Sequence, residues 1–573
     1  MDWSSFTRRY AAKYAHWYAA GFFALIATSW VATTIPLLVA DAIDALATPQ
    51  ANEVPWKAVW IALLGVFVIL VRTASRVLFF TPGRLIEAEL RADLFSRMLM
   101  QQPAFLRNYP PGDLISRATS DIGNLRLLAG FGILQFINTA LTVGFVGVQM
   151  VRISPFLAAL TSVPIVIAFL INHSFIRTLF VLIQRMQTET AAISDHVLSS
   201  YQGLATVQSF NANGAFLEEF DRKNLAYQAS SVHRSGIRAI IGPILGLAAS
   251  LSIFVLLWQG APLAAQGKFS AGQFVAYLSL LGMLISPLRA TSFLLSVAKQ
   301  AQVGLQRLSE VMTPEPDRPD LPAPEPAPKS APKLELRGIS FAYPDAPEVE
   351  VLHDIHVAVE PGQTLGIIGP TGSGKSTLLR CIARLYNPPP GSIWVDNVDL
   401  RRIDLSEWRR QVSVVPQRTF LFSESLKENI LLGAPDDGRL EKMLALTTLD
   451  VDVQSLPDGV ESPVGESGIM LSGGQRQRAA IARGLLKPHH VLLLDDVLSA
   501  VDHATEASLI ATLRQQRPTT LIVAHRISAI QHAHRILVLE GGRVVDSGTH
   551  EELCSRPGFY QDTWHHQQEL AET

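Results

Sequence analysis

The fold of the C-terminal half is decided by one stretch, Gly369-Pro370-Thr371-Gly372-Ser373-Gly374-Lys375-Ser376-Thr377. It follows a short apolar strand pattern at 364–368 and opens a helical pattern that continues through 378–385. The glycines let backbone amides close around a phosphate group, Lys375 reaches the outer phosphate oxygens, and the Ser376 hydroxyl can ligate Mg²⁺. Strand, loop and helix in this order predict an α/β P-loop domain that binds a nucleotide.

A second motif, Leu471-Ser472-Gly473-Gly474-Gln475, precedes a helix expected at 475–486. Its serine hydroxyl and glycine amides form a donor cluster at a helix start, where the dipole favours a γ-phosphate. This cluster is useful only when a nucleotide held by another binding face lies against it. The alternative is an ordinary turn before a helix. Further on, the apolar run 491–495 predicts a buried strand that ends in Asp495, a second Mg²⁺ anchor.

These motifs resemble the ATP-binding cassette family, and the resemblance extends over about 334–569. It implies adenine stacking by Tyr343, contact with Mg²⁺ and the attacking water by Gln417, and γ-phosphate contact by His525. The loop 499–502 matches the segment that crosses between paired cassettes. The implied ATP site consists of Tyr343, Gly369, Thr371, Gly372, Ser373, Gly374, Lys375, Ser376, Thr377, Ser472, Gly473, Gly474, Gln475 and Asp502. The implied Mg²⁺ ligands are Ser376, Gln417 and Asp495, and the implied catalytic residues are Asp496, His525 and Gln417.

The first half of the chain has a membrane composition. The chain has 573 residues, of which 17% are charged, and a mean hydropathy of +0.23, too apolar for a wholly soluble protein. Six runs of about 20 apolar residues or more precede residue 310, each long enough to cross roughly 30 Å of hydrocarbon. A buried soluble helix explains any one of them but not six in series. The runs are 19–40, 56–80, 127–151, 153–176, 239–258 and 274–297.

This pattern predicts a multidomain protein. An all-α transmembrane domain with six spans covers 1–312, a proline-rich linker covers 313–332, and the cassette covers 333–573. Arginine and lysine concentrate in the N-terminal segment and in two long connections, which should therefore be cytoplasmic. An even number of spans returns the cassette to the cytoplasm. The first apolar run is interpreted as a retained span rather than a signal peptide, with no further domain expected before it.

Six spans with two long cytoplasmic loops, followed by a cassette, resemble one half of a type B exporter with the type IV fold. Such halves work in pairs, in a membrane that we expect to be the bacterial inner (plasma) membrane. The segment 108–117 fits the first coupling helix of that family, and 203–210 lies near the second. The resemblance implies that ATP closes the cassettes and that the coupling helices carry this movement to the spans.

One position departs from the family pattern. Active cassettes follow the Mg²⁺-binding aspartate with a glutamate that polarises the attacking water, whereas this chain has Asp496. Aspartate is one methylene shorter, and a misplacement of about 1 Å can cost on the order of a hundredfold in rate. We therefore expect ATP binding with slow hydrolysis at this face. We also expect a heterodimer in which 471–475 completes the active site of a partner that carries the glutamate.

The substrate is only weakly specified. Arg72, His173 and Arg289 fall within or beside the apolar runs, where ionisable groups are costly and by default functional. Arg72 and His173 can alternatively extend to the cytoplasmic interface, so Arg289 is the better candidate to receive an anionic group. The leading function is export of small amphipathic compounds (drugs, lipids or peptides). The alternatives are a homodimeric lipid flippase and an importer of metal chelates, or a regulated channel, on the same fold.

Charge and cysteine content exclude some classes. The net charge of −2 is unremarkable, and the membrane spans argue against nucleic-acid binding. The expected partners are thus membrane lipid and a second half-transporter. Cys381 and Cys554 both fall in the cassette, which the topology places in reducing cytosol, so no disulfide is expected.

Overall fold

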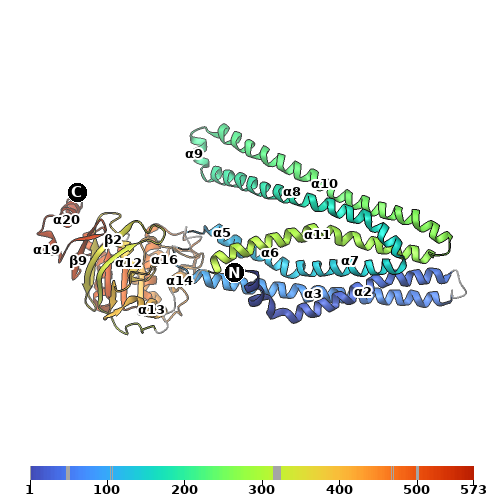
Figure 1. The fold of residues 1–573 in the computed structure, drawn as a ribbon. Helices are drawn as coiled ribbons and strands as arrows, with labels where there is room; N and C mark the ends of the chain where they lie inside the picture. Colours follow the sequence, from blue (N-terminus) through green and yellow to red (C-terminus); the bar gives the residue numbers. More distant parts are fainter. Residues whose placement is uncertain are drawn as a thin grey trace. The chain divides into compact units, whose positions relative to one another are not determined.

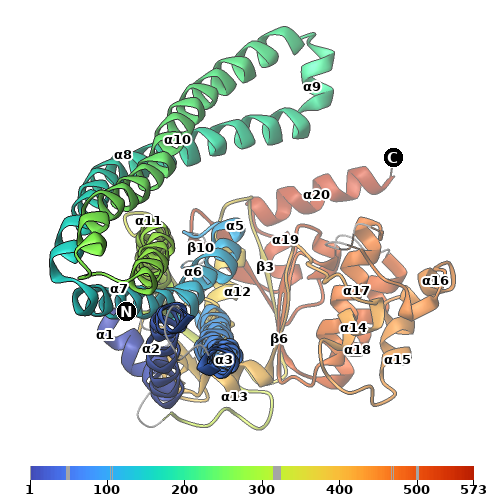
Figure 2. The same cartoon turned by 90° about the vertical axis from the view of Figure 1, so that its right-hand side faces the viewer.

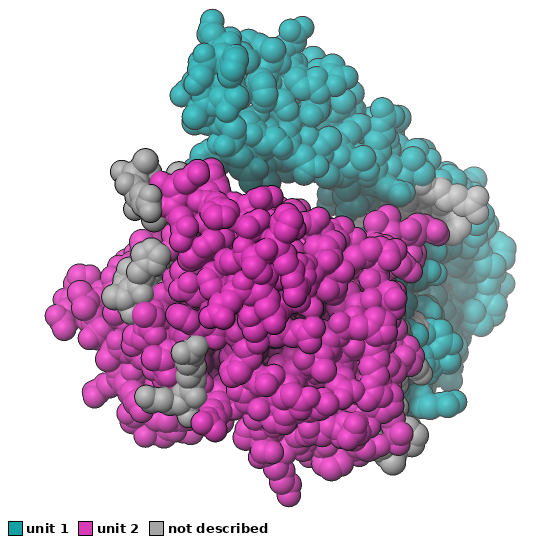
Figure 3. Space-filling view, turned by 90° about the vertical axis from the view of Figure 1, so that its left-hand side faces the viewer, with its two compact units in different colours: residues 1–99, 111–314 teal, residues 100–110, 315–573 magenta. Residues whose placement is uncertain are grey.

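The chain divides into two compact units, each described here by itself. The computed structural model describes residues 2–46, 52–103, 105, 108–313, 324–465, 468, 470–498 and 503–572. One unit comprises Met1–Leu99 and Pro111–Pro314, and the other comprises Met100–Pro110 and Glu315–Thr573 (Figure 3). The first contains helices only, and the second combines helices with two β-sheets.

The helical unit is built from rods much longer than a bilayer is thick (Figure 1). Helices α3, α8 and α10 have 47, 48 and 53 residues, which corresponds to roughly 70–80 Å. The long connections expected from the sequence are therefore largely continuations of the spanning helices. The helices are α1 (Trp3–Phe6), α2 (Ala15–Leu46), α3 (Val54–Met100), α5 (Pro111–Ser116), α6 (Ile122–Leu127), α7 (Ile133–Ile153), α8 (Pro155–Gln202), α9 (Leu204–Ser209), α10 (Asn213–Ala265) and α11 (Ala271–Met312).

Apolar stretches that can cross a membrane recur along this unit in the order expected from the sequence. Among the described residues, five helical stretches are long and apolar enough, and a shorter apolar stretch, Ala271–Ile285, opens α11. Large apolar side chains such as Phe23, Ile69 and Leu70 are exposed, as suits a surface that faces hydrocarbon. The five stretches are Trp3–Leu46, Val54–Met100, Pro111–Ile153, Pro155–Asn172 and Gly246–Ala265.

Two short helices lie at the ends of long helical stretches. Helices α8 and α10 run side by side and are joined at one end by α9, within the region expected to hold the second coupling segment (Figure 1). Helix α5 lies within the first expected coupling segment. Helix α9 thus joins two long helices, whereas α5 opens the continuous helical stretch Pro111–Ile153.

The second unit contains a six-stranded sheet of order β10-β9-β3-β8-β7-β6 and a four-stranded sheet of order β2-β1-β4-β5. In the larger sheet β9, β3, β8, β7 and β6 pair in parallel, so their carboxyl ends meet at one edge. The strands are β1 (Leu334–Ala342), β2 (Glu350–Val359), β3 (Thr364–Ile368), β4 (Ile393–Val395), β5 (Val398–Asp399), β6 (Val412–Val415), β7 (Val491–Asp495), β8 (Thr519–Val523), β9 (Arg535–Glu540) and β10 (Arg543–Gly548).

Apolar cores cover both faces of the larger sheet. One core packs α12 and the smaller sheet against it, and the other packs α14, α15, α17 and α18. Figure 2 shows α14 to α18 gathered on one side of β3 and β6. The helices are α12 (Lys375–Ile382), α13 (Leu405–Gln411), α14 (Leu426–Leu431), α15 (Leu440–Leu446), α16 (Leu449–Gln454), α17 (Gly473–Leu486), α18 (His503–Gln516), α19 (His550–Cys554) and α20 (Phe559–Glu572).

Two helix boundaries differ from the sequence-based expectation. Helix α12 ends at Ile382 rather than 385, because Arg384 adopts a left-handed backbone with φ of 49°. Helix α17 begins at Gly473 rather than Gln475, because the Ser472 side chain caps it and draws both glycines into its first turn.

Candidate functional site

The phosphate loop connects β3 directly to α12 and is shaped by its glycines. Gly372 and Gly374 have φ values of 85° and 95°, which few other residues adopt without strain. The Lys375 ammonium donates to the backbone oxygens of Gly369 and Pro370, both at 2.8 Å. Burial lowers the pKa of Lys375. The loop therefore holds a cation at its centre, where a phosphate group fits.

An open pocket lies over this loop, with a volume of about 650 Å³ when the open space at its mouth is included. A Cβ added at Gly372 would meet nothing within 4 Å, so the loop backbone faces free space. The pocket brings together most of the residues expected from the sequence and adds Val351 and Val523, whereas Tyr343 and Gly369 are not among its lining residues. The expected residues in its wall are Thr371, Gly372, Ser373, Gly374, Lys375, Ser376, Thr377, Gln417, Asp495, Asp496 and His525.

Two oxygen ligands meet beside the loop. The Ser376 hydroxyl donates to Asp495 Oδ1 at 2.8 Å, and Asp495 ends β7, a strand buried throughout. Burial raises the pKa of the Asp495 carboxyl, while the hydrogen bond from Ser376 lowers it. A hydroxyl and a carboxylate are the hard donors that Mg²⁺ prefers, so these residues would hold the ion. Bound Mg²⁺ would neutralise charge on the phosphate oxygens.

Two residues from separate loops approach one carboxylate oxygen of a third residue, Asp496. Gln417 Nε2 donates to Asp496 Oδ2 at 3.2 Å, and His525 Nε2 lies 3.9 Å from the same oxygen. The Asp496 amide donates to the Val523 carbonyl at 2.9 Å, which fixes its backbone between β7 and β8. The three positions that the sequence marks as catalytic thus form one cluster at the carboxyl edge of the sheet.

Tyr343 lies next to the loop, and both its hydroxyl group and its ring contact other side chains. Its hydroxyl lies 2.7 Å from Thr377 Oγ1 and accepts a hydrogen bond from Arg380. Its ring packs edge-on against Tyr386, with centroids 5.1 Å apart. Its role in adenine stacking stays a prediction. Asp502, the remaining residue of the expected ATP site, lies outside the described residues.

The motif at 471–475 forms a capped helix start. Ser472 Oγ accepts from the Gln475 amide at 3.2 Å, and Gln475 Oε1 accepts from the Ser472 amide at 2.8 Å. This reciprocal capping box places Gly473 and Gly474 in the first turn, where amides have no partner within the helix. A Cβ at Gly473 would meet nothing within 4 Å, so this donor cluster faces open space.

Asp452, on α16, is a residue that sequence reasoning missed. Its carboxylate accepts from Gln475 Nε2 at 3.1 Å and from Arg478 Nε at 3.1 Å. It thereby fixes the first turn of α17 and the side chain that caps it. No local signal marks Asp452, because it is 23 residues from Gln475 in the sequence and only the packing of α16 on α17 joins them.

Comparison with known proteins follows the same division of the chain. Residues 18–288 match the family model described as "ABC transporter transmembrane region", and residues 352–499 match the model described as "ABC transporter". A probable multidrug resistance ABC transporter ATP-binding/permease protein of Bacillus subtilis, YheI, is 34% identical over 85% of this chain and 84% of its own length. The chain belongs to the ABC transporter family.

Two further matches extend over nearly the whole transporter. The multidrug resistance-like ATP-binding protein MdlA of Escherichia coli is 33% identical over 89% of this chain and 87% of its own length. A solved structure of a bacterial Atm1-family ABC exporter with ATP bound has a TM-score of 0.80 and covers 98% of both chains at 24% identity. At that identity the likeness shows the fold alone. The type IV exporter fold expected from the sequence is confirmed.

Family membership fixes the general activity. The ABC transporter couples ATP binding and hydrolysis to transport across a membrane. It is a multi-pass protein of the bacterial inner membrane with the cassette on the cytoplasmic side, and exporters of this family function as dimers. Cys381 and Cys554 are free thiols, and burial raises the pKa of Cys381 to about 12.

The candidate substrate residues of the transporter lie on three different helices. Arg72 is an exposed residue on α3, roughly 27 Å along the axis from the start of that helix. This depth is near the far side of a hydrocarbon layer of about 30 Å and favours extension of Arg72 to the interface. The side chains of His173 on α8 and Arg289 on α11 lie outside what the structure describes.

Replacing Gly369 with alanine should destabilise the transporter's cassette. The Gly369 backbone has φ of 156°, and an added Cβ would lie 1.9 Å from the Leu539 carbonyl oxygen. Because a backbone atom blocks the space, we expect a loss of about 1–3 kcal/mol and a lower Tm of the purified protein, with a smaller rise on adding ATP. Gly473→Ala, where the Cβ is unobstructed, is the control. An unchanged Tm for Gly369→Ala would contradict the close approach.

Proposed function

We propose that this chain is the weakly hydrolysing half of a heterodimeric exporter of amphipathic compounds such as drugs, lipids or peptides. Asp496 is the observation that carries the proposal. The two relatives described above, which are named for multidrug resistance, support the substrate class. The apolar surface of the helical unit supports a substrate that enters from the membrane.

The local geometry of Asp496 supports slow hydrolysis. Its backbone is held by the Val523 carbonyl, so the reach of the carboxylate depends on the side chain alone. Its φ is 51°, a left-handed conformation in which aspartate is enriched over most residues. The left-handed backbone at this position therefore favours aspartate over a longer side chain such as glutamate. A carboxylate held about 1 Å from its working position loses on the order of a hundredfold in rate.

The motif at 471–475 supports pairing with a different chain. It is complete, capped and held by Asp452, so it is ready to serve an ATP. In a head-to-tail pair that ATP belongs to the partner's phosphate loop. Pairing with a second copy would place Asp496 in both sites, whereas pairing with a chain that has glutamate leaves one site fully active. We infer that the motif serves the productive site.

In this proposal different residues of the chain bind the phosphates, hold the metal ion and orient the reacting groups. Lys375 and the loop amides bind the phosphates, Ser376 and Asp495 would hold Mg²⁺, and Gln417 with His525 orients the reacting groups. The closure of the cassettes is a two-state change, which ATP can bias only by its higher affinity for the closed state. The continuous helices α8 and α10, joined by α9, would carry that closure into the membrane.

The decisive experiment is ATP-dependent flux in proteoliposomes that contain the chain alone or with the product of an adjacent half-transporter gene. We expect flux of an amphipathic dye out of the cassette side only when both chains are present. Full flux by the chain alone would favour the homodimeric lipid flippase. Uptake towards the cassette side, or flux without ATP hydrolysis, would instead favour the importer or the channel.

Arg289→Ala should change substrate handling without changing ATP binding. We propose that Arg289 receives an anionic group of the substrate, since an ionisable group within an apolar run is costly unless it has a function. Loss of one such contact should raise the substrate concentration for half-maximal ATPase stimulation by about tenfold. Arg152→Ala at the end of α7, where the guanidinium lies 6.0 Å from the Trp30 ring centroid, is the control. An unchanged stimulation profile would exclude Arg289 from the site.

A further inference from the structure

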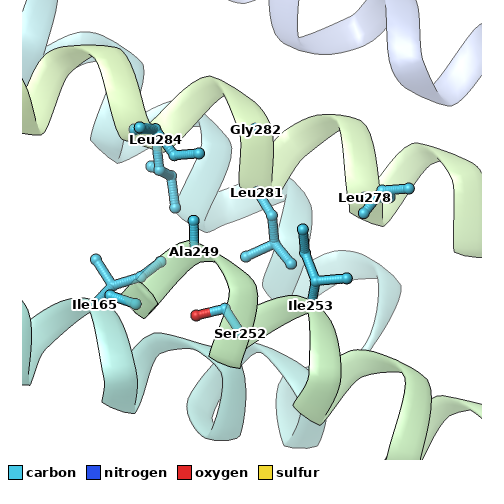
Figure 4. A pocket seen from close by; sticks show the side chains of 10 residues that line it. Ile165, Ala249, Ser252, Ile253, Leu278, Leu281, Gly282 and Leu284 are labelled. Atoms are coloured by element: carbon cyan, nitrogen blue, oxygen red, sulfur yellow. The ribbon is translucent and has the colours of Figure 1, made fainter. Parts of the chain in front are cut away.

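A second pocket lies within the helical unit, between α8, α10 and α11 (Figure 4). Its volume between protein atoms is about 460 Å³ when the open space at its mouth is included. The side chains of Ile165, Ile253 and Leu281 extend into the space between the three helices. The described residues that line it are Ile165, Ala248, Ala249, Ser252, Ile253, Leu278, Leu281, Gly282, Leu284 and Ile285.

The depth of this pocket places it near the middle of the bilayer. All three helices contribute apolar stretches: Pro155–Asn172, Gly246–Ala265 and Ala271–Ile285. Ile165 and Leu281 each lie ten residues after the start of their helix, which is roughly 15 Å along the axis. The hydrocarbon layer is about 30 Å thick, so the pocket lies at the depth of the ends of lipid chains rather than at the depth of the headgroups.

The chemistry of the lining excludes a polar ligand. Of the lining residues in the described part of the chain, Ser252 alone has a polar side chain, and its hydroxyl already donates to the Thr161 carbonyl at 2.8 Å. Among the lining residues that the structure describes none is ionisable, so a headgroup or a charged substrate would have no partner among them. Apolar cavities of this kind also stay dry. The pocket therefore suits a hydrocarbon ligand.

The pocket is held open by packed contacts on both sides along the helices. Towards the outer end, the Thr161 and Tyr277 hydroxyls lie 2.9 Å apart, within a core that includes Leu256 and Leu280. Towards the inner end, Ala168 packs against Ala248. Between these contacts Gly282 and Ala249 supply too little volume to fill the space. The same part of α10 exposes apolar side chains, among them Leu247, Leu251 and Phe254.

We propose that this pocket binds one acyl chain of a bilayer phospholipid. Lipid tails are as apolar as leucine side chains. Transfer of an acyl chain from the bilayer into the pocket is therefore not driven by the hydrophobic effect. The favourable free energy of binding comes from dispersion contacts that the lining residues lack when the pocket is empty. Binding is therefore weak for each chain, and occupancy depends on the high concentration of chains in the membrane. The site acts as a lipid-dependent brace between α10 and α11, independent of which substrate the transporter carries.

Photolabelling tests the site directly. The full-length protein is placed in nanodiscs containing phosphatidylethanolamine with a diazirine near the end of one acyl chain, irradiated, and mapped by mass spectrometry. We expect label on residues 248–253 and 278–285. A Cβ at Gly282 would meet nothing within 4 Å, so Gly282→Leu fills the pocket without a backbone clash. It should lower this labelling by about tenfold, equivalent to about 1.4 kcal/mol.

The controls separate filling from misfolding. Gly144→Leu adds the same side chain on α7, outside the pocket, where a Cβ also meets nothing within 4 Å, and should leave the labelling unchanged. Ala249→Leu fills the pocket from the opposite wall and should act like Gly282→Leu. Gly282→Leu should also raise the Tm in lipid-free detergent and reduce the further rise on adding phospholipid. Equal labelling of 278–285 in Gly282→Leu and the unchanged protein would overturn the proposal.

Discussion

Replacing Asp496 with glutamate is expected to raise ATP hydrolysis at this chain's own site on the order of a hundredfold, because the added methylene extends the carboxylate by about the distance that it lacks. The extension starts from a fixed backbone, since the Asp496 amide is bound to the Val523 carbonyl. The measurement is the ATPase rate of the paired transporter in which the partner's own catalytic glutamate has been changed to glutamine. Only the site of this chain then contributes.

Two controls make the Asp496 result specific. Asp496→Asn keeps the side-chain length but removes the base, so its rate should not exceed that of the unchanged chain. Asp496→Glu should also lower the Tm slightly, because glutamate adopts the left-handed backbone at φ of 51° less readily than aspartate. A purified chain that hydrolyses ATP at full rate with Asp496 in place would show that the short side chain is competent.

Replacing Gly473 with aspartate is expected to abolish hydrolysis at the partner's site. The Gly473 amide is one of the donors at the start of α17, and an aspartate would set a negative charge against the γ-phosphate. Loss of one such donor alone costs about 10²–10³ in rate. The fold should survive, since a Cβ at Gly473 meets nothing within 4 Å and an acidic residue in the first turn of a helix is favourable.

The effect of Gly473→Asp is measured separately at the two ATP sites, as nucleotide binding at this chain's phosphate loop and as hydrolysis at the partner's site. Photolabelling of this chain by an azido-ATP should be unchanged, because the phosphate loop is untouched, while the ATPase rate of the heterodimer falls to background. Gly438→Asp adds the same charge in an exposed loop of the cassette, where a Cβ also meets nothing within 4 Å. The backbone of Gly438 is left-handed, with φ of 81°, a conformation that aspartate adopts more readily than most residues, so this variant should keep full activity. Equal activity of the two aspartate variants would remove 471–475 from the productive site.

The parts predictable from the sequence are those encoded by neighbouring residues. The phosphate loop needs glycines, a lysine and a serine at fixed spacing, and the structure places them between β3 and α12. Membrane spans are equally local, because each must bury its own backbone hydrogen bonds within one apolar run. The predictions of helix ends were less accurate. The end of α12 depends on the left-handed Arg384, and the start of α17 depends on the Ser472 cap.

The sequence by itself determined the nucleotide chemistry, the spans and the unusual Asp496, because each depends on residue type or on spacing within a single segment. Only the tertiary structure decided which distant groups meet. Gln417 and Asp496 are 79 residues apart in the sequence yet hydrogen-bonded, Asp452 holds Gln475 from another helix, and the acyl-chain pocket exists because three helices diverge between packed layers. Such contacts depend on packing geometry, which no local pattern of residues encodes.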